Sequence, residues 1–209
     1  MDGLELLKKD WQNKEVSLPR LSYEEIYKML WKKSSSVVKW IFIISIIEFA
    51  FWSVLSFLLK DSKNMQRLES YNADALITPL TVIGYIILVY FLYRFFVNYK
   101  RISATDNARL LMENILKTRR TVKQYVWFNI IYFIVASIVM SILQLTYDKE
   151  IAGMIENGNS LYLYVIFIGG TLILTGVVSV LIWLFYRLIY GFLLKRLKNN
   201  YNVLKQIDL

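Results

Sequence analysis

Long apolar blocks alternate with polar and charged segments along the chain. Four of these blocks hold about 20 or more residues, which is enough to cross the ~30 Å hydrocarbon core of a membrane as a helix. The blocks cover residues 37–59, 77–97, 125–145 and 161–186. The pattern therefore predicts an all-α integral membrane protein whose four spanning helices form a bundle.

The blocks and the polar segments between them divide the chain into five parts. The first two blocks form one membrane hairpin, and the last two form another. The predicted parts are an N-terminal segment (1–36), the first hairpin (37–97), a basic linker (98–124), the second hairpin (125–190) and a tail (191–209). Both halves follow one plan, a polar helix and then a hairpin, which leaves open whether they arose by duplication.

The N-terminal segment has the pattern of amphipathic helices. Leu4, Leu7 and Trp11 share one helical face. Ser22, followed three residues later by Glu25, forms a capping-box pattern and predicts the start of a second helix. That helix is predicted to run on toward the first span.

Two further polar segments are predicted to be helical. In the linker, Thr105 or Asp106 caps a helix whose apolar stripe comprises Ala108, Leu111, Met112 and Ile115. In the tail, apolar positions recur every three or four residues with an asparagine among them, at Leu193, Leu197, Asn200, Leu204 and Ile207. This spacing resembles a heptad seam and predicts that the fourth span continues as a cytoplasmic helix.

Basic residues are distributed unevenly between the two sides of the predicted membrane. The chain has 25 Lys and Arg against 16 Asp and Glu, a net charge of +9. Most lie in segments 1–36, 98–124 and 191–209, whereas the loops at 60–76 and 146–160 are poor in them. The positive-inside rule then puts both termini and the linker in the cytoplasm, beside a leaflet with anionic lipid. The predicted location is the cytoplasmic, or inner, membrane.

The composition narrows the chemistry open to this chain. It has no cysteine and no histidine, which excludes thiol chemistry, imidazole-bound metals and Ser-His or Cys-His catalysis. No motif for a cofactor, a metal or a catalytic group is found, so the protein is predicted not to be an enzyme. The basic run at 117–123 lies at a membrane boundary, where topology explains it better than nucleic-acid binding does.

Glu48 stands out because it lies in the middle of the first apolar block. A charged side chain at this depth costs about 2.5–3.5 kcal/mol and is usually turned inward or paired. Arg94, Asn129 and Arg187 lie toward the cytoplasmic side of the other three spans, and the four residues form a predicted intramembrane polar cluster. The favoured interpretation is a structural clasp between helices, and the alternative is a proton or cation site.

Small residues recur in the fourth span. Thr171, Thr175 and Ser179 are four residues apart, and Gly169, Gly170 and Gly176 lie among them. Such spacing lets helix backbones approach closely. Packing within the bundle is the favoured interpretation, and a seam between copies of the chain is the alternative.

The stretch ELLKKDWQ…LSYEEIYKMLWKKSSSVVKWI, together with the apolar spans that follow, resembles a group of small four-span inner-membrane proteins of Bacteroidota. That group has no established activity, so the resemblance implies a membrane location and no site residues. The plan of a short cytoplasmic helical segment ahead of a span is also similar to that of membrane-anchored anti-sigma factors. This second likeness implies a regulatory role through a protein partner.

These features predict a non-enzymatic regulatory or accessory (scaffold) subunit that binds a protein partner through its cytoplasmic helices or its bundle surface. A second copy of the chain is the other predicted partner. The predicted binding residues are apolar groups on the short N-terminal helices: Leu4, Leu7, Trp11, Ile26, Leu30 and Trp31. Helices this short cannot bury such groups alone, and packing against the linker helix or the lipid surface is the alternative explanation for them. The alternative function is a small transporter or channel subunit that uses Glu48 inside the bundle.

Overall fold

The structure is a computed structural model and describes residues 5, 22–60, 62–105, 107–148, 153 and 160–207. The described part contains α2 (Tyr23–Leu58), α3 (Lys63–Ser70), α4 (Asp74–Ser103), α5 (Ala108–Tyr147) and α7 (Ser160–Ile207). No strand occurs in these ranges. The predictions made for Leu4, Leu7 and Trp11 lie outside the described residues.

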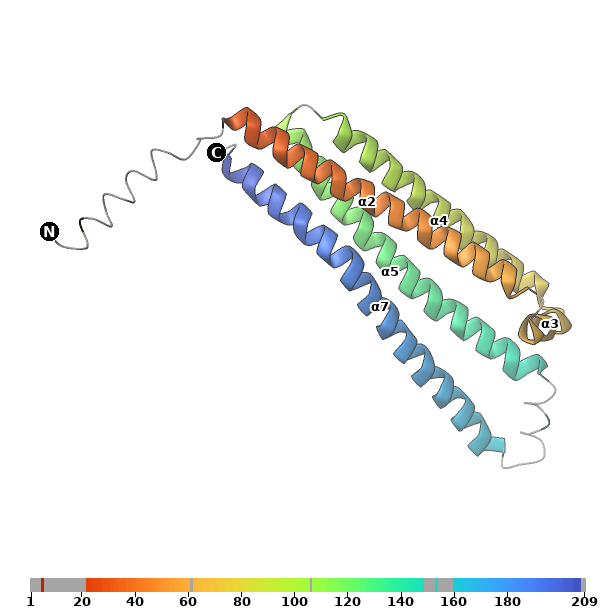
Figure 1. The fold of residues 1–209 in the computed structure, drawn as a ribbon. Helices are drawn as coiled ribbons and strands as arrows, with labels where there is room; N and C mark the ends of the chain where they lie inside the picture. The colour runs from red at the N-terminus through yellow and green to blue at the C-terminus, as the bar shows by residue number, and fades with distance from the viewer. Residues whose placement is uncertain are drawn as a thin grey trace.

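Four long helices form a bundle (Figure 1). α2 packs against α4 and α7, and α5 packs against the same two helices. Consecutive long helices run in opposite directions, so the chain passes back and forth along the bundle. The short helix α3 lies in the connection between α2 and α4, at the end of the bundle far from the C-terminus. The predicted all-α four-helix bundle is confirmed.

The four long helices are each long and apolar enough to cross a membrane. Large apolar side chains cover the outside of the bundle, and Phe57 and Leu188 are 77% and 75% exposed. A water-soluble protein rarely exposes so large an apolar surface, which is typical of a protein solvated by lipid. The chain is therefore a multi-pass membrane protein, as its apolar blocks predict.

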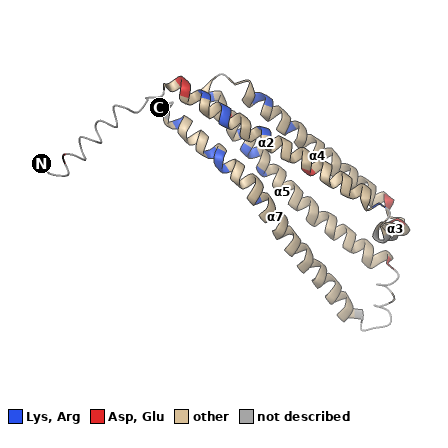
Figure 2. Cartoon of the chain, viewed as in Figure 1, with Lys and Arg blue, Asp and Glu red and all other residues tan. Residues whose placement is uncertain are grey.

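Lysine and arginine gather toward one end of the bundle (Figure 2). α2 begins at this end, α4 ends there and α5 begins there, and α7 ends there at Ile207. We call it the charged end. The helices run into it without a break, since α5 has 40 residues and α7 has 48. The predicted linker and tail helices are thus extensions of the spans.

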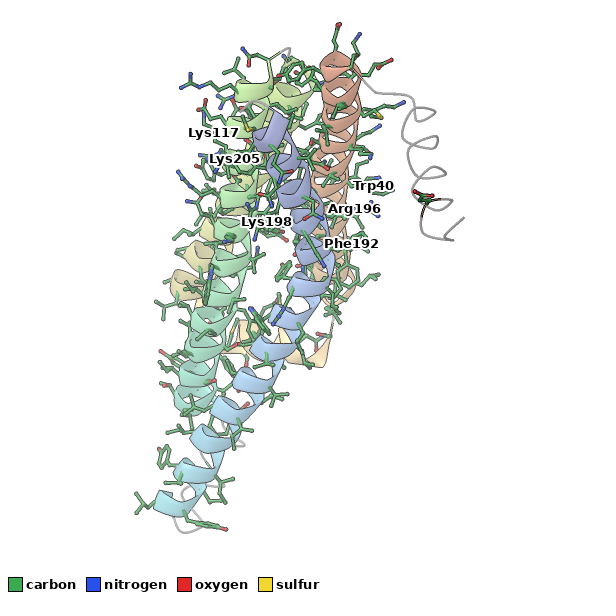
Figure 3. The ribbon with its side chains drawn as sticks, turned by 90° about the vertical axis from the view of Figure 1, so that its left-hand side faces the viewer. Trp40, Lys117, Phe192, Arg196, Lys198 and Lys205 are labelled. Carbon is green, nitrogen blue, oxygen red and sulfur yellow. The ribbon has the colours of Figure 1, made fainter. Side chains whose placement is uncertain are left out.

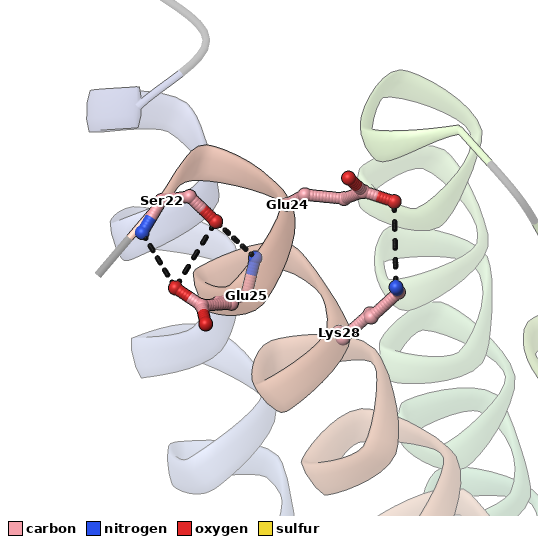
Figure 4. Close-up of polar contacts among 4 residues, drawn as sticks. All are labelled: Ser22, Glu24, Glu25 and Lys28. Atoms are coloured by element: carbon pink, nitrogen blue, oxygen red, sulfur yellow. Dashed lines mark hydrogen bonds and ion pairs between the residues drawn. The ribbon is translucent and has the colours of Figure 1, made fainter.

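The start of α2 has the predicted capping box (Figure 4). The backbone N–H of Glu25 donates to Ser22 Oγ at 3.3 Å, and the backbone N–H of Ser22 donates to Glu25 Oε2 at 2.8 Å. Nearby, Lys28 pairs with Glu24 at 3.3 Å. The reciprocal bonds satisfy two donors that a helix start would otherwise leave without partners.

The start of α5 corrects the sequence prediction, which expected Thr105 or Asp106 as the cap. The cap is Asn107, whose Oδ1 accepts the backbone N–H of Arg109 at 2.8 Å. The hydroxyl of Thr105 instead donates to the carbonyl of Arg101 at 2.5 Å and so belongs to the end of α4. Asparagine is among the strongest cap residues, and the structure selects the one closest to the helix.

The main core runs along the inside of the bundle from the charged end. Its buried members include residues of the predicted stripe and of the predicted seam: Ala108, Leu111, Ile115, Leu193, Leu197 and Leu204. Within the seam, Asn200 donates its side-chain amide to Ser34 Oγ of α2 at 3.0 Å. A polar contact at one position of an apolar seam fixes how far one helix can slide along the other.

A smaller contact closes the opposite end of the bundle. Tyr71, just after α3, donates its hydroxyl to Asp148 Oδ2 at 2.8 Å, and both residues are buried. The ring of Tyr71 also stacks on Tyr147 with 6.2 Å between the centroids. Asn72 has a left-handed backbone conformation (φ 49°), which asparagine tolerates better than most residues. This contact ties the α3–α4 connection to the end of α5.

Candidate functional site

Glu48 lies where α2 meets α7. Its Oε1 accepts a hydrogen bond from the hydroxyl of Tyr186, and the hydroxyl of Tyr190 lies 3.5 Å from its Oε2. Tyr125 of α5 also interacts with the carboxyl group, and its ring packs edge-on against Tyr186 and Tyr190 at 6.0 and 6.1 Å. Phenols from two helices thus surround one carboxyl group. We call Glu48, Tyr125, Tyr186 and Tyr190 the tyrosine cluster.

The structure does not bring together the four residues predicted to form an intramembrane polar cluster. Arg94 donates to the hydroxyl of Tyr90, on its own helix, at 2.8 Å. Arg187 lies over the ring of Trp183, also one turn away, at 4.9 Å from its centroid. Asn129 donates to a backbone carbonyl of its own helix at 2.9 Å. Each therefore finds a partner within its own helix, and none bridges to the carboxyl group on α2.

Tyrosines take the place that the sequence prediction gave to arginines. A carboxyl group in lipid needs donors, and a phenol hydroxyl supplies one without bringing a second charge into the bundle. The phenol ring also fills space in the core, where Tyr186 and Tyr190 are 5% and 2% exposed. One signal in the sequence was overlooked: these two tyrosines are four residues apart, which puts both on one face of the fourth span.

The tyrosine cluster can hold a carboxyl group between helices or bind a proton at its oxygens. Among the described residues, no group of three or more acidic, histidine or cysteine side chains is suited to a metal ion. The geometry is that of a hydrogen-bonded clasp between α2, α5 and α7. This geometry is compatible with the clasp interpretation of Glu48, but the partners are tyrosines and not the predicted arginines and asparagine.

Three residues predicted to bind a partner are used inside the bundle. Leu30 is 7% exposed and belongs to the main core, and Ile26 and Trp31 pack against that core. The indole N–H of Trp31 donates to the carbonyl of Ile102, at the end of α4, at 2.9 Å. α2 is long enough to carry these residues alongside the charged ends of α4 and α5, which cover them. They do not form a free surface.

The glycines of α7 face no other helix of the described chain. A Cβ atom built at Gly169, Gly170 or Gly176 would meet no atom within 4 Å. The favoured prediction, that these residues serve packing within the bundle, is therefore corrected for these three positions. Close packing occurs instead at Gly84 of α4, where a Cβ atom would lie 2.5 Å from the hydroxyl oxygen of Tyr132 on α5.

A groove of about 410 Å³ lies between α5 and α7, and Gly176 is part of its wall. The hydroxyl of Thr171 is satisfied by the carbonyl of Phe167 at 2.8 Å, one turn back on the same helix. Ser179 Oγ is buried and has no hydrogen-bond partner among the described residues. The remaining lining is mainly apolar and includes Ile134, Ile138, Ile142, Leu145, Ile168 and Leu172. We call this groove the α5–α7 face.

Residues 24–209 match the sequence model of a family described as Domain of unknown function (DUF8845). This range covers the helical bundle from α2 to α7. No curated protein and no solved structure matches the chain. The matched domain and the bundle are therefore the same unit.

Proposed function

Because the chain belongs to the DUF8845 family, whose description names no activity, its function has to be inferred from its surfaces. We propose that it is a non-enzymatic accessory or regulatory subunit that binds a membrane-protein partner. The partner's transmembrane helix docks on the α5–α7 face. Of the two binding surfaces expected from the sequence, the cytoplasmic helices and the bundle surface, this proposal takes the second.

The observation that carries the proposal is the open space at Gly176, in the wall of the groove, and at Gly169, two turns before it on the same side of α7. Glycine destabilises a helix interior by about 1 kcal/mol relative to alanine, and Gly169, Gly170 and Gly176 make no close contact within the described chain that would offset this. In lipid, helices associate through close packing, and small residues allow it. A helix from outside the chain would supply the missing contact.

The groove beside these glycines has dimensions that suit one helix face. Its α7 wall runs from Phe167 to Ser179, which is about 18 Å at 1.5 Å per residue. The hydroxyl groups of Ser141, Thr171 and Thr175 also line the groove and give a partner polar groups to contact in a mainly apolar wall. A polar contact of this kind contributes on the order of 1 kcal/mol between membrane helices and helps to set their register.

The proposal includes a location in the cytoplasmic membrane with both termini inside. Its support is the accumulation of Lys and Arg at the charged end, which also carries the α4–α5 connection and the end of α7 (Figure 2). The positive-inside rule relates such an asymmetry to the cytoplasmic side. A reporter enzyme fused after Leu209 and read on both sides of the membrane tests this orientation.

Cross-linking in native membranes tests the partner proposal. The chain has no cysteine, so a single Thr175→Cys substitution creates one defined thiol in the groove. With a short maleimide–benzophenone reagent, whose photoactivated end inserts into C–H bonds of any neighbour, we expect a discrete adduct whose mass differs from twice the 24.8 kDa of the chain. Adding Gly176→Leu should abolish the adduct, because the larger side chain fills the approach path.

The matched control is Ile86→Cys on α4, outside the groove and away from α7, where Ile86 is 62% exposed. Adduct formation there at the same yield would mean random collision in the membrane. An adduct at twice the chain's mass would show that the helix docked there belongs to a second copy of this chain and not to a different protein. Absence of any adduct at Thr175→Cys, Leu172→Cys and Ile138→Cys would refute docking at this face.

A second candidate function is a small transporter or channel subunit that uses Glu48. The observation in its favour is that this carboxyl group sits among three phenols between helices, a geometry that can bind and release a proton. Proteoliposomes that carry a pH-sensitive dye inside would report proton leak. A leak that Glu48→Gln removes supports this function, and the absence of leak in the parent protein rejects it.

A further inference from the structure

A second cavity, of about 360 Å³, lies between α4 and α5 toward the charged end. α4 lines it with Tyr93, Arg94, Val97, Asn98 and Arg101, and α5 lines it with Lys117 and Arg120. Four of these seven side chains are cationic, and no carboxyl group is part of the lining. The cavity is separate from the tyrosine cluster and from the α5–α7 face. We call it the basic pocket.

The cations of the basic pocket are only partly neutralised. Lys117 pairs with Glu113 at 2.7 Å, outside the pocket lining. Arg94 donates to a neutral phenol, and neither Arg101 nor Arg120 forms an ion pair with a described residue. The surrounding field is positive: the pKa of the Glu113 carboxyl is held below its usual range by Lys117 first, and by Arg109 and Arg101 as well.

Hydrogen bonds of polar side chains on α4 and α5 form the base of the pocket. Asn98 is 5% exposed, and its side-chain amide donates to Thr121 Oγ1 of α5 at 3.2 Å. Thr121 in turn donates to the backbone carbonyl of Lys117 at 3.0 Å. These bonds join α4 to α5 at the base of the pocket. The arginines therefore project from a rigid junction between two helices.

The depth of the basic pocket matches the boundary of the apolar block on α4. Tyr93 and Arg94 lie within the predicted second span (77–97), and Arg101 lies about two helical turns farther toward the charged end. Tyr93 in the lining and Val89, one turn before it on the same face of α4, are 64% and 53% exposed. An apolar surface thus adjoins a cluster of cations, as a phospholipid with its acyl chains and phosphate requires.

We propose that the basic pocket binds the phosphate head group of an anionic phospholipid from the leaflet at the charged end. Arg94, Arg101 and Arg120 hold the phosphate oxygens, and the acyl chains lie along the exposed face of α4. Guanidinium groups favour phosphate because they can donate two parallel hydrogen bonds to it. Basic pockets between membrane helices are a known setting for such head groups. The proposal does not depend on the partner proposed for the α5–α7 face.

Native mass spectrometry of the full chain in detergent tests this site. The chain is titrated with phosphatidylglycerol, or with phosphatidylcholine as the lipid without net charge, and retained lipid is counted. We expect one retained phosphatidylglycerol and little phosphatidylcholine. Arg101→Gln with Arg120→Gln should lower the retained phosphatidylglycerol at least ~10-fold, since two of the charge-assisted contacts are lost. Both arginines are exposed, so the fold should tolerate the change.

The matched control removes two cations of the charged end that lie outside the pocket, by Arg196→Gln with Lys198→Gln on α7 (Figure 3). Retention should stay within about twofold of the parent, because only the long-range attraction weakens. An equal loss in both double variants would overturn the proposal in favour of diffuse surface charge. Equal retention of the two lipids would overturn it as well.

A third arm separates a lipid site from a site for free phosphate. Inorganic phosphate is added to the phosphatidylglycerol complex, and lipid retention is measured again. Retention that persists at a large molar excess of phosphate supports a lipid, because the acyl chains add apolar contact that the free ion lacks. Displacement at concentrations equal to that of the lipid would identify a soluble phosphate site and would reject the lipid.

Discussion

The hydroxyl of Tyr186 donates a hydrogen bond to Oε1 of Glu48 and so joins α7 to the middle of the first apolar block. A carboxyl group at this position is costly in lipid unless it is turned inward and hydrogen-bonded. Tyr186 and Tyr190 meet this requirement from one helix, and Tyr125 adds a contact from another. The four residues make the most concentrated polar contact inside the described bundle.

Removing both partners of this contact should reveal their coupling. In a double-mutant cycle with Glu48→Leu and Tyr186→Phe, we expect a coupling energy of about 0.6–1.7 kcal/mol, the range found for hydrogen bonds between membrane helices. The measurement is the free energy of unfolding in mixed micelles. A parallel cycle of Glu48→Leu with Arg94→Gln should give a coupling near zero. A larger coupling to Arg94 than to Tyr186 would reinstate the ion pair expected from the sequence.

Two glycines should respond in opposite ways to alanine. Gly84→Ala is expected to destabilise the bundle by about 1–3 kcal/mol, because the new Cβ would lie 2.5 Å from Tyr132 Oη. Tyr132 would have to move and lose its bond to the Leu80 carbonyl, now 3.1 Å long. Gly170→Ala meets open space and should leave the purified protein equally stable or up to about 1 kcal/mol more stable. Thermal unfolding in detergent compares the two variants.

The contact between Asn200 and Ser34 should stabilise the bundle mainly by satisfying a buried hydroxyl group. Asn200→Ala leaves the hydroxyl of Ser34, a fully buried residue, without this partner and should cost about 1–3 kcal/mol. Asn200→Leu combined with Ser34→Ala removes both polar groups and should restore most of that loss. Unfolding free energies test both steps. A double variant as unstable as Asn200→Ala alone would show that lost packing, and not the unpaired hydroxyl, causes the effect.

The capping box of α2 should weaken in acid. Hydrogen bonds from Ser22 hold the pKa of the Glu25 carboxyl below its ordinary value of 4.5. The bond from the backbone N–H has the largest effect, and the bond from the hydroxyl has the second largest. A lowered pKa in the folded state means that the stabilisation is full above the ordinary value and is lost as pH falls through the lowered one. Amide-exchange protection at residues 23–26 should therefore drop between about pH 6 and about pH 3. Ser22→Ala should show low protection at both pH values, and unchanged protection in the parent would contradict the prediction.

The sequence predicts the long elements well because lipid imposes a simple rule on them. A block of about 20 apolar residues is both necessary and nearly sufficient for a span, and all four were found this way. The stripe around Leu111 and the seam around Leu197 were also predicted. In a helix of 3.6 residues per turn, the apolar residues of the buried face recur every three or four positions in the sequence. Both residues are fully buried.

The partners of Glu48 could not be predicted because they depend on how each helix is rotated about its axis. An apolar span has almost the same composition on every side, so the pattern does not say which of the 15 tyrosines faces the carboxyl group. Charge complementarity suggested Arg94 and Arg187, yet each has an aromatic partner one turn away. A partner one turn away on the same helix follows from the sequence alone. A partner on another helix can be predicted only if the rotation of both helices about their axes is known.

The open glycines were misassigned for a related reason. Small residues at helical spacing indicate that some helix approaches, but the spacing does not say whether that helix belongs to the same chain. Gly84, a single glycine without a repeat, is the position where two helices of the bundle meet closely. The cap at Asn107 could not be predicted for a similar reason. Several neighbouring residues have similar capping ability, and only the backbone conformation decides which of them begins the helix.

α7 also has a mechanical consequence. Its 48 residues form one helix without a proline, so no hinge of that kind separates its membrane part from its C-terminal end. From Tyr186 to the end of the helix the distance is about 32 Å at 1.5 Å per residue, and a tilt of about 10° around Tyr186 would swing that end by about 5 Å. Because Leu193, Leu197 and Leu204 pack this half of α7 into the core, such a tilt would move the packed helices with it, and a displacement of the membrane part of α7 would reach the charged end.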